Sequence, residues 1–592
     1  MRRVTPPPLA PPRRVPPLAW PADAELTMPG SKSDANRLLV LAALCGERVR
    51  VRGCTASDDV RRLVAGLQAL GFEATHDEAA GVVDVGPRPA DAPDRAEIHC
   101  GNAGTALRFL VSVAAITPGE WTLTGDLAMQ RRPIGALAAA WRQLGVDVRD
   151  AGGCPPVVVR GGNPREAVVT LDGSASSQFL SSLLLVGGAL AFPLQVRIAG
   201  ELASAEYAQL TLRALQRFGV QATSLGDRLF ATVPGFGPAR DDVAAAGDWS
   251  SFGAWACVNR LTGSRIRPAN LALGSAQADE GMPALLRAMP DRGDWSIDAA
   301  AMPDQFPNLA ATAALRSGTT TFFGGANLRV KECDRIAVMA RELRRLGADV
   351  DERPDGLVVR GGRPLHGGVV DPEHDHRIAM AAALLGLFVP GVAVAAPGCV
   401  AKSCPGFWAD LDRVVAARRC VAVVGMRGAG KSTFARAFAE RSGVEAFDGD
   451  VAFAAAHGPI AAFVQAHGWP AFRAEEAQLA DALLQPGRVV ALGGGAIETE
   501  AVRQLLRARA FVLWLDAPVD VLRARLAADA AARPSVTGAP VLDELDQLAA
   551  RREPLHRAAA QVRLDATQPV DALVAAALAA LRAPCVWPRS AH

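Results

Sequence analysis

The chain has 592 residues, which is too long for one hydrophobic core and predicts three to four domains. Half of its residues are hydrophobic and 21% are charged, as in globular proteins, and its formal net charge of +2 argues against a general nucleic-acid or membrane surface. Only four of the 63 basic residues are lysines: Lys32, Lys331, Lys402 and Lys431. An ammonium is a compact charge that can lose its proton, and each lysine lies in a motif-like stretch, so we interpret all four as site residues.

The ten cysteines are scattered, without a CxxC pair or a His/Cys cluster. This pattern predicts reduced thiols, no zinc site and a cytoplasmic protein. Residues 1–20 are rich in Pro and Arg and lack a continuous apolar stretch, so we expect a disordered lead-in and no secretory signal. Residues 378–398 are uncharged and long enough to span a membrane, but Pro390-Gly391 interrupts them; a buried helix followed by a strand is expected.

The first motif along the chain is a polar turn, Pro29-Gly30-Ser31-Lys32-Ser33-Asp34-Ala35-Asn36-Arg37, which opens into the apolar run 38–44. Ser33 or Asp34 is expected to cap the helix. A lysine, a hydroxyl and an arginine then converge where the backbone N–H groups of a helix point outward. The turn therefore predicts an anion site.

A helix that ends at a glycine and is followed by alternating residues recurs along the chain. The glycines are Gly71, Gly145, Gly219 and Gly347. The first three are evenly spaced, since 145 − 71 and 219 − 145 are both 74, and the fourth lies about two units further on, so a degenerate copy is expected between them. The glycine suits a helix C-cap, and the pattern predicts a repeated α/β unit over roughly residues 30–410.

Polar loops of unusual content separate these helices. They are Gly101–Arg108, Arg131–Pro133, Asp172–Phe179, Ser204–Tyr207, Pro303–Asp304, Asn327–Arg335, His374–Arg377 and Ala401–Lys402. His374 and His376 lack a third metal ligand and are expected to be structural. Together the loops supply many cations and hydroxyls and two carboxylates, which suits a substrate with several phosphates or carboxylates and acid–base groups nearby.

A phosphate-binding loop follows close behind this region. Residues 420–424 predict a buried strand, and residues 425–433 read GxxxxGKS before a helix. Backbone N–H groups would wrap the phosphates, Lys431 would reach the outer ones and Ser432 would meet magnesium. Beyond it, a carboxylate beside the phosphate loop, two arginines and the glycine run 493–495 suit a small polyhydroxy acid as acceptor.

The motifs PGSKSDANR, GNAGTALR, RRPIG, DGSASSQFL, the Asp304 context, NLRVKECDR, DHRIAM and AKSCPGF resemble EPSP synthase (3-phosphoshikimate 1-carboxyvinyltransferase), in the same order. The resemblance covers residues 21–415. It implies an α/β fold of two globular subdomains, each built from repeated α/β units into an inside-out barrel-like domain. The chain would cross between the subdomains near residues 30 and 240. The implied reaction needs no cofactor and transfers enolpyruvyl from phosphoenolpyruvate to the 5-hydroxyl of shikimate 3-phosphate.

The same resemblance assigns site residues. Shikimate 3-phosphate would bind Lys32, Ser33, Arg37, Ser176, Ser177, Gln178, Ser204, Tyr207, Asp304, Asn327 and Lys331. Phosphoenolpyruvate would bind Lys32, Gly104, Arg132, Gln178, Arg335, Arg377 and Lys402. Asp304, Glu332, Lys32 and Lys402 are the catalytic candidates, and the order of proton transfers stays open. Ala205-Glu206 departs from the basic residue and proline expected before the tyrosine, which puts affinity in doubt.

Residues 420–583 resemble shikimate kinase, a P-loop domain with a parallel sheet flanked by helices; residues 584–592 follow as a tail. The resemblance places ATP on Gly428, Ala429, Gly430, Lys431, Ser432, Thr433 and Arg533, and magnesium on Ser432 and Asp448. It places shikimate on Asp450, Arg473, Gly494, Gly495 and Arg552, with Lys431 and Asp450 as catalytic residues. Ala454 departs from a usual acidic residue, His556 from a usual tyrosine, and the lid reads Arg-Pro-Ser.

The kinase product would be the transferase substrate, so the sequence predicts a cytoplasmic, bifunctional enzyme that runs two adjacent steps towards chorismate. Its partners would be small molecules, with no nucleic acid and no membrane; a monomer is compatible, and the oligomeric state stays open. Three alternatives remain. The transferase half could act on a UDP-sugar, the kinase half could phosphorylate another acid such as gluconate, or the C-terminal half could be a degenerate nucleotide-binding module that regulates the first.

Overall fold

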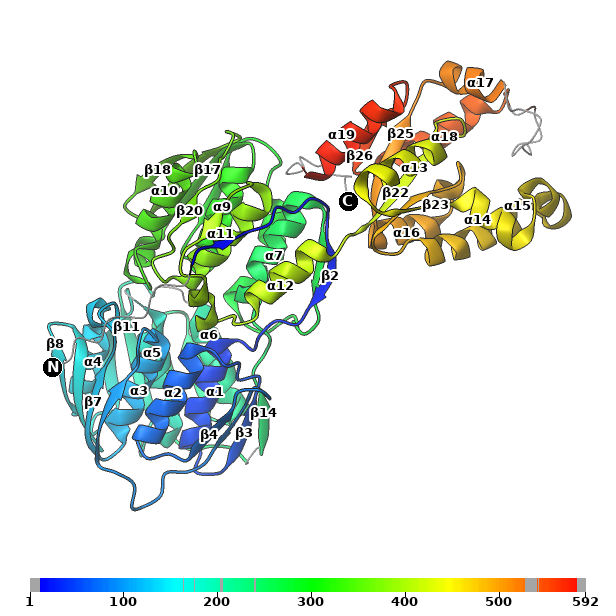
Figure 1. The fold of residues 1–592 in the computed structure, drawn as a ribbon. Coiled ribbons are helices and arrows are strands. Elements are labelled where there is room, and N and C mark those ends of the chain that lie inside the picture. The colour runs from blue at the N-terminus through cyan, green and yellow to red at the C-terminus, as the bar shows by residue number, and fades with distance from the viewer. Residues whose placement is uncertain are drawn as a thin grey trace. The chain divides into compact units, whose positions relative to one another are not determined.

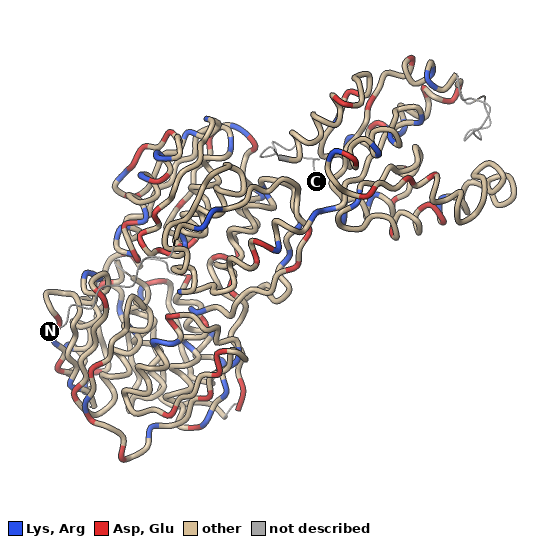
Figure 2. The backbone as a smooth tube through the Cα atoms, in the orientation of Figure 1, with Lys and Arg blue, Asp and Glu red and all other residues tan. Residues whose placement is uncertain are grey.

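The structure is a computed structural model that describes residues 11–162, 164–174, 176–202, 206–238, 241–527, 540 and 542–582. The chain forms two compact units (Figure 1). The first comprises Met1–Pro16, Leu26–Cys257 and Pro268–Asp410, and the second comprises Pro17–Glu25, Val258–Arg267 and Leu411–His592. Basic and acidic residues are interspersed along both units (Figure 2), in keeping with the small net charge.

Four sheets of the first unit share one topology. Their strand orders are β14 (Asp242–Ala244), β3 (Val49–Arg52), β5 (Val82–Val85), β4 (Ala74–Asp77); β6 (Arg95–His99), β7 (Gly119–Thr124), β9 (Cys154–Gly161), β8 (Asp147–Ala151); β10 (Val168–Asp172), β11 (Leu194–Ala199), β13 (Leu229–Thr232), β12 (Ala222–Leu225); and β16 (Trp295–Asp298), β17 (Gly318–Phe323), β19 (Gly356–Gly361), β18 (Asp349–Arg353). In each, the first two strands are parallel and the others antiparallel. The predicted repeat is therefore present as a repeated sheet.

Helices of the first unit cover these sheets. Those before residue 218 are α1 (Lys32–Leu44), α2 (Asp58–Ala69), α3 (Gly104–Ile116), α4 (Gly135–Gln143), α5 (Ser177–Leu185) and α6 (Glu206–Arg217). They share one hydrophobic core with the first three sheets. The later helices include α8 (Met282–Ala288), α9 (Phe306–Leu315), α10 (Arg335–Arg345) and α11 (His376–Phe388). Helix α7 (Trp249–Thr262) begins in the first unit and ends in the second.

The four repeat glycines end helices in the same way. Their φ angles are positive, from 69° to 94°. At Gly71 the glycine N–H bonds back to Gln68, and the next residue bonds back to Leu67; the other three copies repeat this pattern. Only glycine adopts this conformation without strain, which explains its recurrence. The copy predicted between Gly219 and Gly347 is degenerate, because its helix α8 has only seven residues before β16.

Two expectations from the sequence need correction. The N-cap of α1 is Ser31, and the helix begins at Lys32, one residue before the expected caps. Asp34 instead accepts a hydrogen bond from the Ala246 N–H at 2.9 Å, because it is buried inside the unit. Residues 11–20 are ordered: β1 (Arg13–Arg14) pairs with β21 (Ala393–Val394).

The apolar run 378–398 folds as predicted, into the buried helix α11 followed by β21. Among the described helices, none combines the length and apolar character needed to cross a membrane.

Two stretches far apart in the sequence lie side by side at the start of α1. Gly30 bridges to Gly247, and the Ser31 N–H donates to the Ala246 carbonyl at 2.7 Å. A Cβ on Gly30 would lie 1.7 Å from the Gly53 carbonyl oxygen, so this approach requires glycine. The pairing fixes the anion turn against residues that follow β14.

The second unit contains a parallel sheet of five strands. Their order is β23 (Glu445–Asp448), β24 (Arg488–Ala491), β22 (Cys420–Gly425), β25 (Ala510–Asp516), β26 (Val562–Asp565). Alternate residues of β22 enter two cores: Val421 and Val423 pack with α13 (Lys431–Ser442) and α19 (Val570–Arg582), and Ala422 with α16 (Glu500–Arg509). Helices therefore cover both faces, as predicted.

Residues before the kinase-like sequence complete this unit. Trp20 is 6% exposed and packs in the core with Phe438, at 5.4 Å between ring centroids. Its indole N–H donates to the Arg419 carbonyl at 2.7 Å, and the Arg419 N–H donates to the Pro21 carbonyl at 2.7 Å. Nearby, β2 (Asp23–Leu26) pairs with β15 (Arg265–Pro268). The second unit is thus assembled from three separate segments of the chain.

Trp20→Ala is expected to lower the free energy of unfolding of the second unit by about 3–5 kcal/mol, because it removes a buried indole and leaves a cavity. Denaturant unfolding of the full chain measures this, with loss of the ATP binding expected of the kinase-like half as the signal. Trp20→Phe keeps one aromatic ring and loses the hydrogen bond and part of the buried volume, so it should cost less than Trp20→Ala. Equal midpoints for wild type and Trp20→Ala would show that the segment does not support this unit.

Candidate active sites

The polar loops of the first unit meet around one cavity. Its lining residues are Lys32, Ser33, Asp59, Gly104, Thr105, Arg108, Arg132, Ser176, Ser177, Gln178, Tyr207, Asp304, Asn327, Lys331 and Glu332. They come from the starts of α1, α2, α3 and α5, from the segment before α4, from α6, and from segments flanking α9 and α10. Sequence stretches as distant as residues 32 and 332 therefore converge on one place, with many cations and few apolar groups.

Two carboxylates and three cations form a connected cluster beside this cavity. Arg335 is 1% exposed and donates to Asp304 at 2.9 Å and to Glu332 at 3.1 Å. Arg377 donates to Asp304 at 3.2 Å, and the Lys402 ammonium lies 2.8 Å from Glu332. Asp375 caps α11 and holds Arg335 from the other side at 2.8 Å. Each carboxylate is thus held between two cationic groups.

These contacts keep both carboxylates ionised. Burial alone would raise the pKa of Asp304, but Arg377 and Arg335 hold it well below its usual value. Burial likewise opposes the charge of Glu332, and Lys402 and Arg335 more than compensate, so its pKa also lies well below the usual range. Both groups are therefore ionised near neutral pH.

Several buried donors point to an anionic ligand. Arg377 Nε and Nη1 and Arg132 Nε are buried and make no hydrogen bond to any described residue. A Cβ on Gly104 would lie 2.7 Å from the Arg132 guanidinium carbon, so glycine lets that group approach the start of α3. Buried donors are normally satisfied, so unsatisfied cations beside a polar cavity indicate a bound anion.

The two lysines of the cavity differ in basicity. Burial opposes the charge of Lys32, but Asp59, Glu332 and Asp304 raise its pKa above the ordinary value. Burial lowers the pKa of Lys331 to about 8; Asp304 opposes this shift, and Arg335 adds to it. Lys331 therefore loses its proton just above neutral pH, whereas Lys32 stays charged.

The resemblance assigns shikimate 3-phosphate to Lys331. Its KM is expected to be flat near pH 7 and to rise about tenfold per unit above pH 8, because only the ammonium form of Lys331 attracts the anion. Initial rates between pH 7 and 9.5 measure this. Lys331→Arg keeps its charge throughout this range and should flatten the profile. A steep rise that persists in Lys331→Arg would assign the titration to another group.

Of the described residues predicted for this site, Arg37 alone lies outside both the carboxylate cluster and the cavity. Arg37 does not line it, because its guanidinium donates to Thr211 at 2.9 Å, to the Ser33 carbonyl at 2.6 Å and to Ser181 at 3.1 Å. In this structure Arg37 braces α1 against α5 and α6. Ser204 lies outside the described residues.

Two residues of this site were missed from the sequence. Asp59, at the start of α2, lies 3.5 Å from the Lys32 ammonium, and nothing in its local sequence marks it. Arg108, inside the motif GNAGTALR, donates to Gln178 at 2.6 Å. His376, expected to be structural, is fully buried; burial, Lys32 and Arg377 keep its pKa well below the usual value, so the ring is neutral.

The phosphate loop of the second unit has the geometry its sequence predicts. Gly428 and Gly430 have φ of 79° and 86°, and α13 begins at Lys431 directly after β22 and the loop. The Lys431 ammonium donates to the Met426 carbonyl at 3.0 Å, across the loop. Successive N–H groups at a helix N-terminus, with a lysine over them, form a site for phosphates.

A cavity of about 250 Å³ lies next to this loop. It is lined by Arg427, Asp450, Ala454, Pro459, Ile460, Ala461, Trp469, Phe472, Arg473, Glu476 and Gly493–Gly495. A Cβ on Gly493 would lie 2.4 Å from Glu476 and 2.9 Å from Asp450, and one on Gly495 would lie 2.0 Å from Arg473. The glycine run thus lets two carboxylates and a guanidinium reach the same small space, which suits a polyhydroxy acid.

The remaining predicted residues that the structure describes do not line this cavity. Asp448 ends β23 and caps α14 (Gly449–His457) by accepting from the Asp450 and Val451 N–H groups. Arg552 is 1% exposed and donates to Glu498 at 2.8 Å. Ser432 and Thr433 follow Lys431 at the exposed start of α13. Arg533 lies outside the described residues. Among the residues that are described, no cluster of three or more His, Cys, Asp or Glu suits a metal ion.

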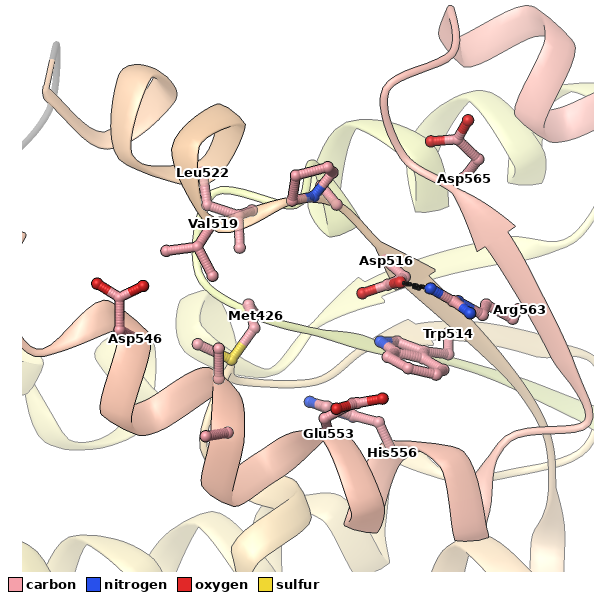
Figure 3. Close-up of a pocket in the computed structure, with 14 residues that line it drawn as sticks. Met426, Trp514, Asp516, Val519, Leu522, Asp546, Glu553, His556, Arg563 and Asp565 are labelled. Atoms are coloured by element: carbon pink, nitrogen blue, oxygen red, sulfur yellow. Dashed lines mark hydrogen bonds and ion pairs between the residues drawn. The ribbon is translucent and has the colours of Figure 1, made fainter.

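A larger cavity of about 610 Å³ lies between β25, β26 and α18 (Leu545–Ala559), and none of the predicted site residues lines it (Figure 3). On its wall the His556 ring stacks on Trp514 at 5.8 Å, and Arg563 pairs with Asp516. Burial lowers the pKa of His556 to about 3. The histidine that stands where a tyrosine is usual is therefore neutral and packs as an aromatic ring.

Comparisons with known proteins show what each part of the chain is similar to. A family model described as EPSP synthase (3-phosphoshikimate 1-carboxyvinyltransferase) matches residues 20–411, and one described as shikimate kinase matches residues 427–582. A 3-phosphoshikimate 1-carboxyvinyltransferase from Methanosphaerula palustris is 39% identical over 411 residues, covering 66% of this chain and 96% of that protein. One from Pseudomonas syringae pv. syringae is 35% identical over 399 residues, covering 66% and 95%.

Solved structures are similar as well. EPSP synthase from Acinetobacter baumannii aligns with a TM-score of 0.56 at 23% identity, over 68% of this chain and 98% of that one. The enolpyruvyl transferase NikO from Streptomyces tendae aligns with a TM-score of 0.55 at 18% identity, over 69% and 98%. At these identities the likeness establishes the fold alone.

Proposed function

The chain belongs to the EPSP synthase family over residues 20–411 and carries a shikimate kinase domain over residues 427–582, and we propose which of its residues carry out each of the two reactions. It is a bifunctional enzyme of the shikimate pathway. The kinase domain phosphorylates shikimate at the 3-hydroxyl with ATP. The synthase half transfers enolpyruvyl from phosphoenolpyruvate to the 5-hydroxyl of that product, releasing phosphate. The observation that carries this reading is the presence of both sites, each with its own cations and carboxylates, in one polypeptide.

We propose domain limits of 21–415 for the synthase and 420–583 for the kinase, with a tail at 584–592. The packing of Trp20 adds one refinement: the kinase fold also uses residues 17–25 and 258–267.

In the synthase site, Asp304 is proposed to accept the proton of the 5-hydroxyl. It is ionised, and it lies with Tyr207, Asn327 and Lys331 in the lining that we assign to shikimate 3-phosphate. The Lys402–Glu332 pair is proposed to deliver a proton to the phosphoenolpyruvate methylene and to take it back as phosphate leaves, because its two polar atoms lie 2.8 Å apart. Arg132, Arg335 and Arg377 would hold the phosphate and carboxylate of phosphoenolpyruvate. No cofactor is needed for this half.

In the kinase site, Asp450 is proposed to orient the 3-hydroxyl and accept its proton, and Lys431 to neutralise the transferring phosphate. Ser432 and Asp448 would hold Mg²⁺; both offer oxygen ligands, and they lie at the start of α13 and at the C-terminal end of β23, on the same edge of the parallel sheet. When bound, the ion would neutralise charge on the ATP phosphates. Arg473 and Arg552 would take the shikimate carboxylate, and Gly494 and Gly495 would line the site, with Gly495 beside Arg473.

The proposed partners are these small molecules alone, and the proposed location is the cytoplasm. Nine described cysteines are free thiols, which supports a reducing compartment.

A one-pot assay with shikimate, ATP, Mg²⁺ and phosphoenolpyruvate tests the function, with ADP and phosphate followed separately. Both products should appear, and adding shikimate 3-phosphate should bypass the kinase. Replacing shikimate by gluconate, or shikimate 3-phosphate by a UDP-sugar, should give no turnover. Phosphate release without ADP formation from any of these acids would leave only the synthase half of the proposal standing.

A further inference from the structure

One carboxylate in the kinase unit is shared by three arginines. Glu498 ends the 3₁₀ turn Ala496–Glu498, directly after the glycine run that lines the acceptor cavity. Its Oε2 lies 2.8 Å from Arg552 Nη2 and 3.6 Å from Arg473 Nη2, and its Oε1 lies 2.5 Å from Arg551 Nη2. Its side chain is only 18% exposed, so solvent screens these contacts weakly.

Two of these arginines are the ones assigned to the substrate's carboxylate. Arg473 also pairs with Glu476 at 2.6 Å, so both of its terminal nitrogens are already near protein carboxylates. Arg552 is almost fully buried, and its Nε and Nη1 make no hydrogen bond to a described residue. A guanidinium with two buried, unsatisfied donors is ready for a second carboxylate while Nη2 stays on Glu498.

We propose that Glu498 is a specificity-determining residue of the kinase, an internal carboxylate that shares Arg473 and Arg552 with the carboxylate of the substrate. This inference rests on the proposed phosphorylation of shikimate. Glu498 fixes the Arg552 side chain, and its charge also repels the incoming acid, because both carboxylates bind the same guanidinium groups. It therefore sets the affinity for acidic acceptors below the value that the arginines alone would give.

Glu498→Gln separates these effects, because the amide oxygen still accepts from Arg552 while the negative charge is lost. Its KM for shikimate should fall by about 3- to 10-fold relative to wild type. Methyl shikimate, an uncharged ester, should show a KM change of less than about twofold, because it carries no charge for Glu498 to repel. Glu500→Gln is the matched control: it removes the same charge two residues away, from an exposed carboxylate paired with Arg503 and Arg507.

Arg551→Gln tests the same idea with the opposite sign. Arg551 is half exposed and neutralises Glu498 from the side, so its loss leaves more negative charge on the shared carboxylate. The KM for shikimate should then rise about 2- to 5-fold, with little change for the methyl ester. This variant alters an exposed residue and keeps the test available if Glu498→Gln folds poorly, which thermal unfolding would reveal.

The outcomes separate this inference from the function it rests on. Absence of wild-type turnover with shikimate would remove the proposed function itself. Normal wild-type turnover with an unchanged or higher KM in folded Glu498→Gln would overturn this inference alone. So would an equal fall for acid and ester, since a structural change acts on both.

Discussion

Lys431→Ala is expected to lower the kcat for ADP formation from shikimate and ATP by about 10²- to 10³-fold. The Lys431 ammonium lies over the loop formed by Gly428 and Gly430, hydrogen-bonded to the Met426 carbonyl. It is the lysine placed to reach the outer phosphates of ATP, so its loss removes the main fixed charge that stabilises the transferring group. Single-turnover ADP release by the purified full chain measures the effect.

The synthase half supplies the internal control for this variant. Phosphate release from added shikimate 3-phosphate and phosphoenolpyruvate should be the same in Lys431→Ala and wild type, because Lys431 belongs to the second unit and the synthase cavity to the first. A parallel loss of both activities would mean that the variant damages the whole chain. Undiminished ADP formation would remove Lys431 from the proposed mechanism.

Asp304→Asn is expected to lower the kcat of enolpyruvyl transfer by about 10²- to 10⁴-fold. The variant keeps the shape of the side chain, but its single amide oxygen can accept from only one of Arg335 and Arg377, which donate to the two different carboxylate oxygens of Asp304 at 2.9 and 3.2 Å. It loses the charge that lets the group accept the hydroxyl proton. Phosphate release from shikimate 3-phosphate and phosphoenolpyruvate, measured near pH 7, follows this step directly.

The same variant separates chemistry from binding. Removing the charge of Asp304 also leaves Arg335 and Arg377 with less compensation, so the KM for phosphoenolpyruvate should fall or stay constant while kcat drops. ADP formation by the kinase should be unchanged. A rise in both KM values with an intact kcat would show instead that Asp304 only binds substrate, and that the base lies elsewhere.

Local patterns in the sequence were sufficient for the repeated architecture and for the phosphate loop. The glycine that ends each repeat helix needs only its own backbone conformation, and φ from 69° to 94° at Gly71, Gly145, Gly219 and Gly347 confirms it. The phosphate loop is equally local, since strand, glycines, lysine and helix are contiguous in residues 420–442. Signals of this kind survive because neighbours in the sequence are neighbours in space.

The tertiary structure decided which side chains meet. Asp59 reaches Lys32 because α2 packs beside α1, and Arg37 is turned inward because Thr211 lies 2.9 Å from it on a helix 174 residues away. Likewise Trp20 enters a core whose sheet lies about four hundred residues later, bonding to Arg419 with a separation of 399. Such contacts depend on packing between distant elements, which periodicity and motif spacing do not encode. The sequence by itself therefore determined the two chemistries and the folds that carry them. Only the folded chain decided that Glu498 pairs with three arginines and which buried cations keep unsatisfied donors for a substrate.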